Sequence, residues 1–549
     1  MLSNCRLNRM RSIAALIVAT GASAVAIPLP TAAQLAYQQQ EIVALTHFNM
    51  ATFYQDGDPA CTAANWGTSQ KPASFAPTAL NISNWIENYK VVGAKSGILT
   101  AKHGCGFLLW PTNVTFPDGS PYGYHVGGSG GIGRDIVGEF AEAMGAAGLP
   151  HSFYFSLKDS FLMNAVHDKV RDPSTLIPGQ RAVTQAQFEA VHVAAVTELW
   201  SRYGNLTEIW FDGGISDSIK GRIVPLLRRL QPDAVPMGAG IENSANEVDW
   251  VGTETGEPAY PVWSTGCTAP GAGSRGVSPA KATNFCPKCG DCTLQSPDHW
   301  FWMPNTPIKP LAQLVAMYHG TVGQNAVMEL DFAVDRTGNI DPTHAARYAE
   351  FGGWIDACYG DANAAARSGP AFANASQLVL PLGKAPVAVD RVAVSEDLAH
   401  GQRILAYTVE VQTAGSSAWA PFVAGTAVGH KHINIAPTAT AAATALRLTV
   451  TSSVAPPLIR LDAFGPAACA AGPAPGHKCS DRADQVYTGP VVERHKPGTG
   501  FNTEALCCAR CGALKGCAVF NLHADKTCEL LSATQSSMAE AGAVSGSWE

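Results

Sequence analysis

The amino-acid sequence predicts an α/β fold: a (β/α)8-type barrel, followed by a β-sandwich domain and a small disulfide-rich module. Three observations lead to this prediction. Short apolar runs alternate with helical stretches over residues 34–360, strand-like runs alone follow over 370–465, and cysteines crowd into 469–549. Because a chain of 549 residues exceeds what one hydrophobic core usually organises, several domains are expected.

The first domain has the pattern of a parallel α/β architecture. Its candidate strands are the apolar runs at 42–48, 96–101, 152–156, 207–211, 234–237, 248–251 and 327–332. Helical segments at 135–147, 188–203 and 219–230 lie between some of them. An open doubly wound sheet would show a similar alternation, but no Gly-rich phosphate loop follows a strand, so the barrel is the better prediction.

The second domain begins after a linker rich in small residues at 362–368. Strand-like runs follow at 377–380, 389–394, 404–412 and 445–451, and no long amphipathic helix interrupts them. This texture predicts a β-sandwich over 370–465.

The tail at 469–549 is a third unit. Six cysteines lie in a short span, with Cys469 just before them: Cys479, Cys507, Cys508, Cys511, Cys517 and Cys528. A unit this small has little core, so disulfides are expected to stabilise it. Zinc at Cys508-x2-Cys511 is the alternative, but no His pair accompanies it.

The N-terminus indicates the compartment. Arg6, Arg9 and Arg11 precede an apolar run at 13–27, so residues 1–33 are expected to be a signal peptide cleaved near Ala26 or Ala33. A retained anchor helix is the alternative, but the run is short and rich in Ala, Gly and Ser. No second hydrophobic stretch approaches spanning length, so no membrane span is expected in the mature chain. The expected location is extracellular or the lumen of an acidic organelle.

Other features agree with secretion. The 15 cysteines suit an oxidising compartment, and sequons for N-glycosylation begin at Asn81, Asn113, Asn205 and Asn374. The formal net charge is −7, without long basic runs, which argues against nucleic acid as a partner.

The segment at 204–214, GNLTEIWFDGG, carries the strongest chemical signal. An apolar strand ends at Asp212, and a carboxylate at the C-terminal tip of a barrel strand faces the region where catalytic groups collect. The two glycines that follow let the backbone turn away and leave space for a ligand. The alternative is an Asp that caps the next helix.

The segment at 98–111, ILTAKHGCGFLLWP, is the second signal. A strand delivers Lys102 and His103 to its end, and Phe107 and Trp110 follow. Polar groups that hydrogen-bond to hydroxyls, together with aromatic faces, are typical of a sugar-binding site. A core histidine bonded to the backbone is the alternative.

These segments resemble the α-L-fucosidase family of glycoside hydrolases, which uses a retaining mechanism on a (β/α)8 barrel. Further resemblances are THFNMATF at 46–53, HSFYFSLKD at 151–159 and DWVGTETG at 249–256, so the likeness runs through most of 40–345. It implies a fucosylated glycan as substrate and a catalytic barrel. The family chemistry needs no metal or other cofactor.

The resemblance implies two catalytic carboxyls. Retaining hydrolysis needs one carboxylate that attacks the anomeric carbon and one carboxyl that protonates the leaving oxygen. Asp212 is the expected nucleophile and Glu254 the expected acid/base. Glu257 is the next candidate for the acid/base, and Glu208 is less well placed because it lies within the strand. An ordinary loop carboxylate is the alternative for Glu254.

The resemblance also implies sugar contacts. The positions that match are His47, His103, Tyr154 and Trp210, and the pocket mouth is expected to include Phe301 and Trp302. Asp291 resembles an Asp of the family whose role the sequence does not assign.

Several positions depart from the family pattern. Gly104 and Cys105 replace a His and an Asp, Asp249 stands where some relatives carry Arg, and Leu157-Lys158 replaces Pro-Trp. These changes keep both carboxyls but are expected to remove sugar contacts. Two alternatives therefore stay open: a fucose-binding protein with weak or no turnover, and a retaining glycosidase for another sugar.

Cys286, Cys289 and Cys292 have the spacing C-x2-C-x2-C, which would suit a metal or an iron–sulfur cluster. With Cys267 nearby in a secreted chain, loop disulfides are the better prediction.

The accessory domains also resemble known modules. The stretch VDRVAVSEDLAHGQRILAYTVEV resembles the C-terminal β-domain of many of these fucosidases, for which packing on the barrel is favoured over sugar binding. The tail, through ALCCARCGALKGCAVFNL, resembles a PAN/apple module, which would imply a carbohydrate or protein ligand.

Overall fold

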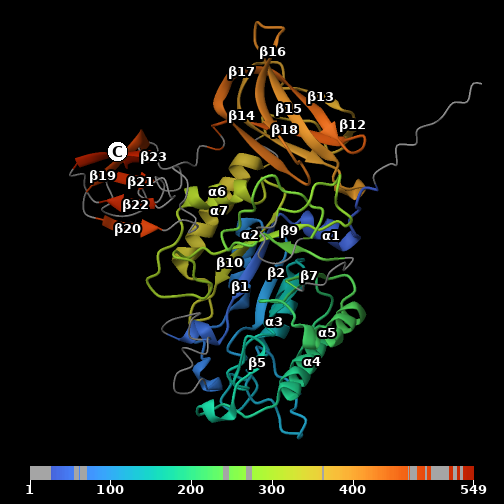
Figure 1. The fold of residues 1–549 in the computed structure, drawn as a ribbon, viewed down its shortest axis with the longest axis vertical. Coiled ribbons are helices and arrows are strands. Elements are labelled where there is room, and N and C mark those ends of the chain that lie inside the picture. Colours follow the sequence, from blue (N-terminus) through green and yellow to red (C-terminus); the bar gives the residue numbers. More distant parts are fainter. Residues whose placement is uncertain are drawn as a thin grey trace, which may run out of the picture.

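In the computed structural model of the chain, a barrel domain lies beneath a β-sandwich in the view of Figure 1. The structure describes residues 26–54, 61, 71–238, 246–267, 275–360, 364–467 and 469, with the backbone of five further strands between 479 and 548. Most of the predicted signal peptide and the side chains of the tail therefore lie outside the described residues.

Parallel strands form the barrel. In the described part of the chain they are β1 (Ile42–His47), β2 (Gly97–Lys102), β3 (His151–Phe155), β6 (Glu208–Trp210), β7 (Val235–Met237), β8 (Asp249–Trp250), β9 (Lys288–Cys292) and β10 (Val327–Ala333). They neighbour one another in the order β7-β6-β3-β2-β1-β10-β9-β8, and a parallel bridge between Met237 and Val248 joins the two ends of that order. The predicted barrel is therefore confirmed.

Helices cover the outside of the barrel. They are α2 (Ile82–Val92), α3 (Ile136–Ala146), α4 (Gln185–Arg202), α5 (Asp217–Leu230), α6 (Leu311–Gly320) and α7 (Pro342–Tyr359). Local signals set where they begin: Asp135 caps α3, and Thr184 forms a capping box with Gln187 at the start of α4. The predicted segments at 135–147, 188–203 and 219–230 correspond to α3, α4 and α5.

Strand β9 is the barrel strand that the apolar pattern missed. Its sequence, Lys-Cys-Gly-Asp-Cys, has no β-branched or aromatic residue, yet every residue is buried, and the strand pairs with β10 on one side and β8 on the other. Cys289 and Cys292 lie in this strand as free thiols, so the prediction of loop disulfides is wrong for them. Cys267 and Cys286, just before it, do form a disulfide.

Helix α1 (Ala32–Gln38) closes the N-terminal end of the barrel. Gln34 Nε2 donates to the carbonyls of Glu247 (2.9 Å) and Phe285 (3.0 Å), and Gln38 Nε2 donates to that of Asn325 (3.2 Å). These three carbonyls precede β8, β9 and β10. Tyr37, 1% exposed, packs with the side chains that fill the barrel interior.

The second domain is an antiparallel sandwich, as predicted. Its strands are β11 (Ala366–Arg367), β12 (Ala373–Asn374), β13 (Gln377–Pro381), β14 (Val387–Glu396), β15 (Ile404–Thr413), β16 (Trp419–Gly425), β17 (His432–Ser453) and β18 (Leu458–Phe464). The long β17 pairs with β14 in its first half and with β15 in its second, so it passes from one layer to the other. Alternating side chains such as Val392, Val394, Val409 and Leu448 fill the core between the layers.

The sandwich packs on the barrel through a loop that reaches the N-terminal ends of β1 and β10. Glu41, directly before β1, accepts hydrogen bonds from His430 Nε2 (2.8 Å) and Lys431 Nζ (2.6 Å). Nearby, Asn325 Oδ1 accepts from the backbone N–H of His430 (2.7 Å). The junction therefore lies at the opposite end of these strands from their C-terminal tips.

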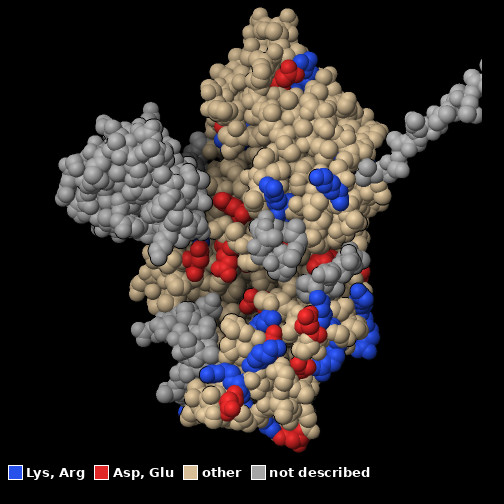
Figure 2. All heavy atoms as spheres, viewed as in Figure 1, with Lys and Arg blue, Asp and Glu red and all other residues tan. Residues whose placement is uncertain are grey.

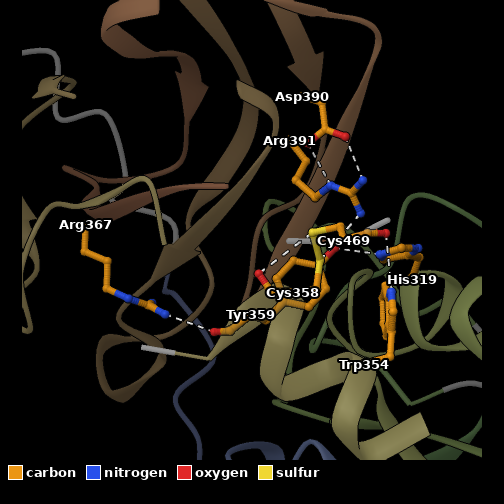
Figure 3. The surroundings of a disulfide bond; sticks show 8 residues. All are labelled: His319, Trp354, Cys358, Tyr359, Arg367, Asp390, Arg391 and Cys469. Carbon is orange, nitrogen blue, oxygen red and sulfur yellow. Dashed lines mark hydrogen bonds and ion pairs between the residues drawn. A yellow bond between two sulfur atoms is a disulfide. The ribbon is translucent and has the colours of Figure 1, made fainter. Parts of the chain in front are cut away.

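A disulfide makes a second connection between the domains. Cys358, at the end of α7, bonds Cys469, which follows the sandwich (Figure 3). Arg391 of β14 lies beside it, held by Asp390, and directs Nη1 to the Cys358 sulfur (3.7 Å). In the sequence Cys469 lies next to the cysteine-rich tail, but in the structure it is bonded to a helix of the barrel domain.

The tail forms an antiparallel sheet of its own. Its strands are β19 (Cys479–Thr488), β20 (Val491–His495), β21 (Val519–Leu522), β22 (Cys528–Leu531) and β23 (Ser536–Trp548), in the order β19-β23-β21-β22-β20. The predicted disulfides of this module concern side chains outside the described residues. No helix in the described part of the chain has the length and apolar character needed to cross a membrane.

The ion pairs of Glu41 predict a pH-dependent junction. Burial alone would raise the pKa of Glu41, but the charge of Lys431 and the hydrogen bond from His430 outweigh it and hold that pKa well below its usual range. A carboxyl with a lowered folded-state pKa stabilises the fold above its unfolded-state pKa, and this stabilisation is lost as pH falls through the folded-state value. Glu41→Gln should therefore lower the free energy of unfolding near pH 7 by about 1 kcal/mol, which corresponds to a decrease in Tm of about 2–4 °C.

Calorimetry across the pH range checks this. The Tm difference between wild type and Glu41→Gln should shrink below about pH 4.5, where the unfolded-state carboxyl is protonated. Glu350→Gln is the control, because Glu350 forms an exposed pair with Arg347 on α7. A Tm difference that is the same at acid and neutral pH would contradict the assignment.

Candidate active site

A pocket opens at the C-terminal ends of the barrel strands. The residues that line it are Leu45, His47, His103, Tyr154, Trp210, Asp212, Glu254, Asp291 and Trp300. Both expected catalytic carboxyls and four of the five expected sugar contacts are among them. Strands β1, β2, β3, β6, β8 and β9 each contribute a residue from the strand or the loop that follows it.

Asp212 lies at the tip of β6. Gly213 and Gly214 follow with φ angles of 69° and 80°, a left-handed backbone that glycine adopts without strain. The chain therefore turns sharply and leaves the Asp212 carboxylate exposed to the pocket. Tyr154 Oη donates a hydrogen bond to Asp212 Oδ2 at 2.7 Å, which fixes the orientation of the carboxylate.

Three rings are stacked along one wall of the pocket. The centroids of His103 and Tyr154 are 5.6 Å apart at an interplanar angle of 24°, and those of Tyr154 and Trp210 are 5.4 Å apart at 19°. Trp210 Nε1 donates to Glu329 Oε2 in the barrel interior (2.7 Å). Through the stack, Tyr154, which bonds Asp212, is therefore linked to the buried carboxylate of Glu329.

His47 ends β1 and is fixed from below. Its Nδ1 lies 2.8 Å from Oδ1 of the buried Asp331 on β10. Burial and the neighbouring His103 hold the pKa of His47 well below its usual value, so the ring is neutral. Because the carboxylate of Asp331 accepts, Nδ1 carries the proton and Nε2 is the acceptor of this ring.

Glu254 follows β8 and is exposed at the pocket. Trp300 Nε1 lies 3.3 Å from Glu254 Oε2. Gly256, at φ 78°, has the left-handed backbone that favours glycine, and it packs closely on Cys292 and Thr321. The Thr321 hydroxyl donates to the Gly256 carbonyl at 2.6 Å, so this loop is anchored to the end of α6.

Glu257 and Glu208, the other carboxyls considered from the sequence, are not among the pocket-lining residues. Glu257 packs against Gly320 at the end of α6, and burial raises its pKa to about 7. Glu208 is 2% exposed, and burial together with the charge of Glu329 raises its pKa well above the usual range. Both carboxyls are therefore part of the scaffold.

Asp291 of β9 brings a third carboxyl to the pocket. It is 3% exposed, and Trp250 Nε1 donates to its Oδ1 at 2.5 Å. Burial and the charges of Glu329 and Glu254 raise the pKa of Asp291 well above its usual range, although the Trp250 bond opposes this shift. The surroundings of Asp291 therefore favour the protonated form of its carboxyl.

The aromatic residues of the last barrel loop are placed differently from the expectation. Trp300, which the sequence did not single out, lines the pocket and lies 5.0 Å from the His47 ring. Trp302 is not among the lining residues and lies beside Arg336 (5.9 Å). Phe301 is buried and packs edge-on against His47 and His103 (5.2 and 4.8 Å), so it supports those rings from behind.

The unusual residues after His103 form a covalent tether. Cys105 is bonded to Cys61, and both are almost fully buried. The His103 carbonyl accepts from the N–H of Gly106 (2.8 Å), which closes the turn that the disulfide holds. Lys102, by contrast, points inward and donates to the carbonyls of Ser156 (2.5 Å) and Asp159 (3.0 Å).

Asp249, where some relatives carry Arg, does not line the pocket. Its Oδ2 pairs with Lys288 Nζ at 2.8 Å inside the barrel.

Among the residues that the structure describes, no three His, Cys, Asp or Glu side chains form a group that could hold a metal ion. On the face seen in Figure 2, acidic and basic side chains are interspersed over the barrel.

Comparisons with known proteins agree with this geometry. A model of the α-L-fucosidase family matches residues 36–360. α-L-Fucosidase 1 of Arabidopsis thaliana is 27% identical over 457 residues, which are 74% of this chain and 81% of the plant protein. A homologue from Oryza sativa is 25% identical over 456 residues, 74% of this chain and 79% of its own length.

The fold is also similar to that of a crystal structure. An α-L-fucosidase homologue from Bacteroides thetaiotaomicron superposes with a TM-score of 0.68 at 28% identity, over 80% of this chain and 100% of that one. The family model covers the whole barrel, including every residue that lines the pocket. This chain therefore belongs to the α-L-fucosidase family of glycoside hydrolases.

Proposed function

We propose that the chain is a retaining exo-α-L-fucosidase that removes terminal fucose through a covalent fucosyl-enzyme. The observation that carries the proposal is the pair of carboxyls on one pocket: Asp212, oriented by Tyr154, and Glu254, open to solvent. Membership of the family supports the choice of sugar.

Asp212 is the nucleophile in this proposal. Tyr154 occupies Oδ2, so Oδ1 is left to attack the anomeric carbon. The bond from that carbon to the leaving oxygen breaks as the bond to Oδ1 forms, and the leaving oxygen takes a proton from Glu254. Water, deprotonated by Glu254, then displaces Asp212 and releases fucose with its configuration retained.

The remaining pocket residues would bind the sugar. His47 Nε2 is an acceptor for a hydroxyl, because Nδ1 is committed to Asp331. His103 brings a second imidazole, and the indoles of Trp210 and Trp300 supply apolar faces for the C–H surface of a deoxysugar. The mixture of few polar groups with aromatic walls is typical of a ligand pocket.

Asp291 is the competing acid. Its pKa is raised by burial and it lines the same pocket, but it is buried, whereas the acid/base must reach an aglycone at the open side and later a water. Glu254 meets that requirement better. Asp291 is instead placed to donate to a sugar hydroxyl from its second oxygen.

Secretion is also part of the proposal. The four sequon asparagines, Asn81, Asn113, Asn205 and Asn374, are all exposed, and disulfides join cysteines far apart in the sequence. Cleavage of a leader near Ala26 would keep Thr31, the N-cap of α1, whereas cleavage after Ala33 would remove it. We therefore favour the earlier position.

Hydrolysis of an activated aryl α-L-fucoside by the purified chain tests the mechanism. Asp212→Asn should lower kcat by about 1000-fold or more, because an amide is a far weaker nucleophile than a carboxylate. Glu254→Ala should still form the fucosyl-enzyme from substrates with good leaving groups but should hydrolyse it slowly, and azide should restore turnover and give the α-fucosyl azide. The fucose first released by wild type should be the α-anomer by NMR.

Asp291→Asn is the matched comparison. It keeps the shape of the side chain and a group that can donate a hydrogen bond, so kcat should change little and azide should have no effect. Azide rescue of Asp291→Ala but not of Glu254→Ala would reverse the two roles. No turnover by wild type, with fucose still bound, would favour a binding protein, and cleavage of another aryl glycoside alone would change the sugar.

The Cys61–Cys105 disulfide gives a separate prediction. The double change Cys61→Ala and Cys105→Ala should reduce stability by about 2–4 kcal/mol and should raise KM, because the turn that bears His103 is released. Cys267→Ala with Cys286→Ala is the control, since this disulfide lies away from the pocket. It should lower Tm without changing KM. Equal KM values in both double variants would show that the first disulfide is structural only.

A further inference from the structure

A buried chain of contacts runs from the N-terminal helix through the barrel to the nucleophile. Tyr37 Oη of α1 donates to Glu329 Oε1 at 2.8 Å, and Trp210 Nε1 donates to Glu329 Oε2 at 2.7 Å. The Trp210 ring stacks on Tyr154, and Tyr154 Oη donates to Asp212 Oδ2. Every step of this chain is a direct contact.

Glu329 is the central member of this chain. It is fully buried on β10, and both of its oxygens accept from a neutral donor. Burial raises the pKa of Tyr37 far above its usual range, so the phenol keeps its proton and remains a donor. Burial and the charge of Glu329 raise the pKa of Glu208, which lies beside Glu329. Glu329 is thus held as an acceptor for Trp210.

The hydrogen bond between Trp210 and Glu329 also restrains the rings that line the pocket. An indole bonded at Nε1 cannot rotate about its side-chain bonds without losing a buried hydrogen bond. Tyr154 lies between the fixed Trp210 ring and the His103 ring, so its hydroxyl is aimed at one oxygen of Asp212. Small displacements of a nucleophile are costly, because attack needs a narrow range of distance and angle.

We propose that Tyr37 and Glu329 are positioning residues for the nucleophile, acting through Trp210 and Tyr154. The inference rests on the proposed hydrolase function, since it assigns Asp212 the role of nucleophile. Helix α1, at the end of the barrel away from the pocket, is then part of the catalytic scaffold as well as a cover for the core.

A purely structural role for Tyr37 makes a different prediction. Gln38, the next residue, also anchors α1 by a buried hydrogen bond, to the Asn325 carbonyl, but it does not touch Glu329. If α1 only closes the barrel, loss of either polar group should have the same effect on the enzyme. Gln38 Oε1 also accepts from the Ser264 hydroxyl at 2.9 Å. Tyr37→Phe and Gln38→Met can be compared directly, because each keeps the approximate size of the side chain and removes all of its hydrogen bonds to the barrel.

Kinetics and calorimetry of the full chain test the proposal. Tyr37→Phe should lower kcat for an aryl α-L-fucoside about tenfold with KM within about twofold of wild type. Gln38→Met should lower Tm by at least as much with kcat unchanged. Glu329→Gln should be more severe, because an amide offers one acceptor to two donors.

The double variant Tyr37→Phe, Glu329→Gln adds a rescue test. Loss of the phenol removes one donor that competes with Trp210 for the amide oxygen of residue 329, so the double variant should be no less active than Glu329→Gln alone. Additive losses, or kcat of Tyr37→Phe within about twofold of Gln38→Met, would overturn the proposal.

A binding measurement separates this inference from the proposed function. A protonated iminosugar of fucose shape pairs its ring nitrogen with the Asp212 carboxylate, so its affinity reports the placement of Asp212 without turnover. Tyr37→Phe should weaken this binding about tenfold, and Gln38→Met should not. If wild type binds the iminosugar but hydrolyses nothing, the proposed function fails and the affinity ratio still decides the positioning role. If wild type does not bind it, both fail.

Discussion

The parallel pairing of β1 with β10 brings the start of the barrel beside its end, and the pocket depends on it. The two strands pair over six residues, from Ile42 with Met328 to His47 with Ala333. This register sets Asp331 beneath His47. It also directs Glu329 and Asp331, two residues apart, to the same interior face of the strand. A shift by one residue would exchange both acids for apolar neighbours and leave His47 without its partner.

An acidic barrel interior follows from this register. Barrel interiors are usually filled by branched aliphatic side chains, whereas this one buries carboxyls that need compensation. The buried carboxyls are Glu208, Asp249, Asp291, Glu329 and Asp331. Compensation takes three forms: raised pKa values of Glu208 and Asp291, an ion pair between Asp249 and Lys288, and hydrogen bonds from neutral rings to the other carboxyls. Neutral donors fix orientation without adding charge, which suits a site that must keep one carboxylate reactive.

Much of this arrangement can be predicted from the sequence. Apolar runs locate seven barrel strands, and Asp212 is identified because an apolar strand ends in Asp-Gly-Gly. Strand β9 escapes prediction because its burial comes from neighbours on both sides and not from its own residues. Trp300 is missed for a related reason. Three aromatic residues adjoin at 300–302, and only the closed barrel decides which of them faces the pocket.

Covalent connections are also beyond the reach of sequence spacing. In the sequence, Cys105 only departs from the family pattern at a position expected to contact the sugar. The fold is needed to show that Cys61 lies next to it. Cys469 adjoins a cysteine-rich tail but bonds Cys358, on a helix that the chain leaves 111 residues earlier. Distances in three dimensions, not density of cysteines along the chain, decide which sulfurs meet.

The position of α1 has a consequence for biosynthesis. This helix leaves the ribosome about 200 residues or more before the groups that its polar side chains contact, which belong to Glu247, Phe285, Asn325 and Glu329. A helix of seven residues is marginal in water by itself. The helix can therefore dock only after most of the barrel has been synthesised. Any factor that binds this segment in the nascent chain would compete with its docking on the barrel.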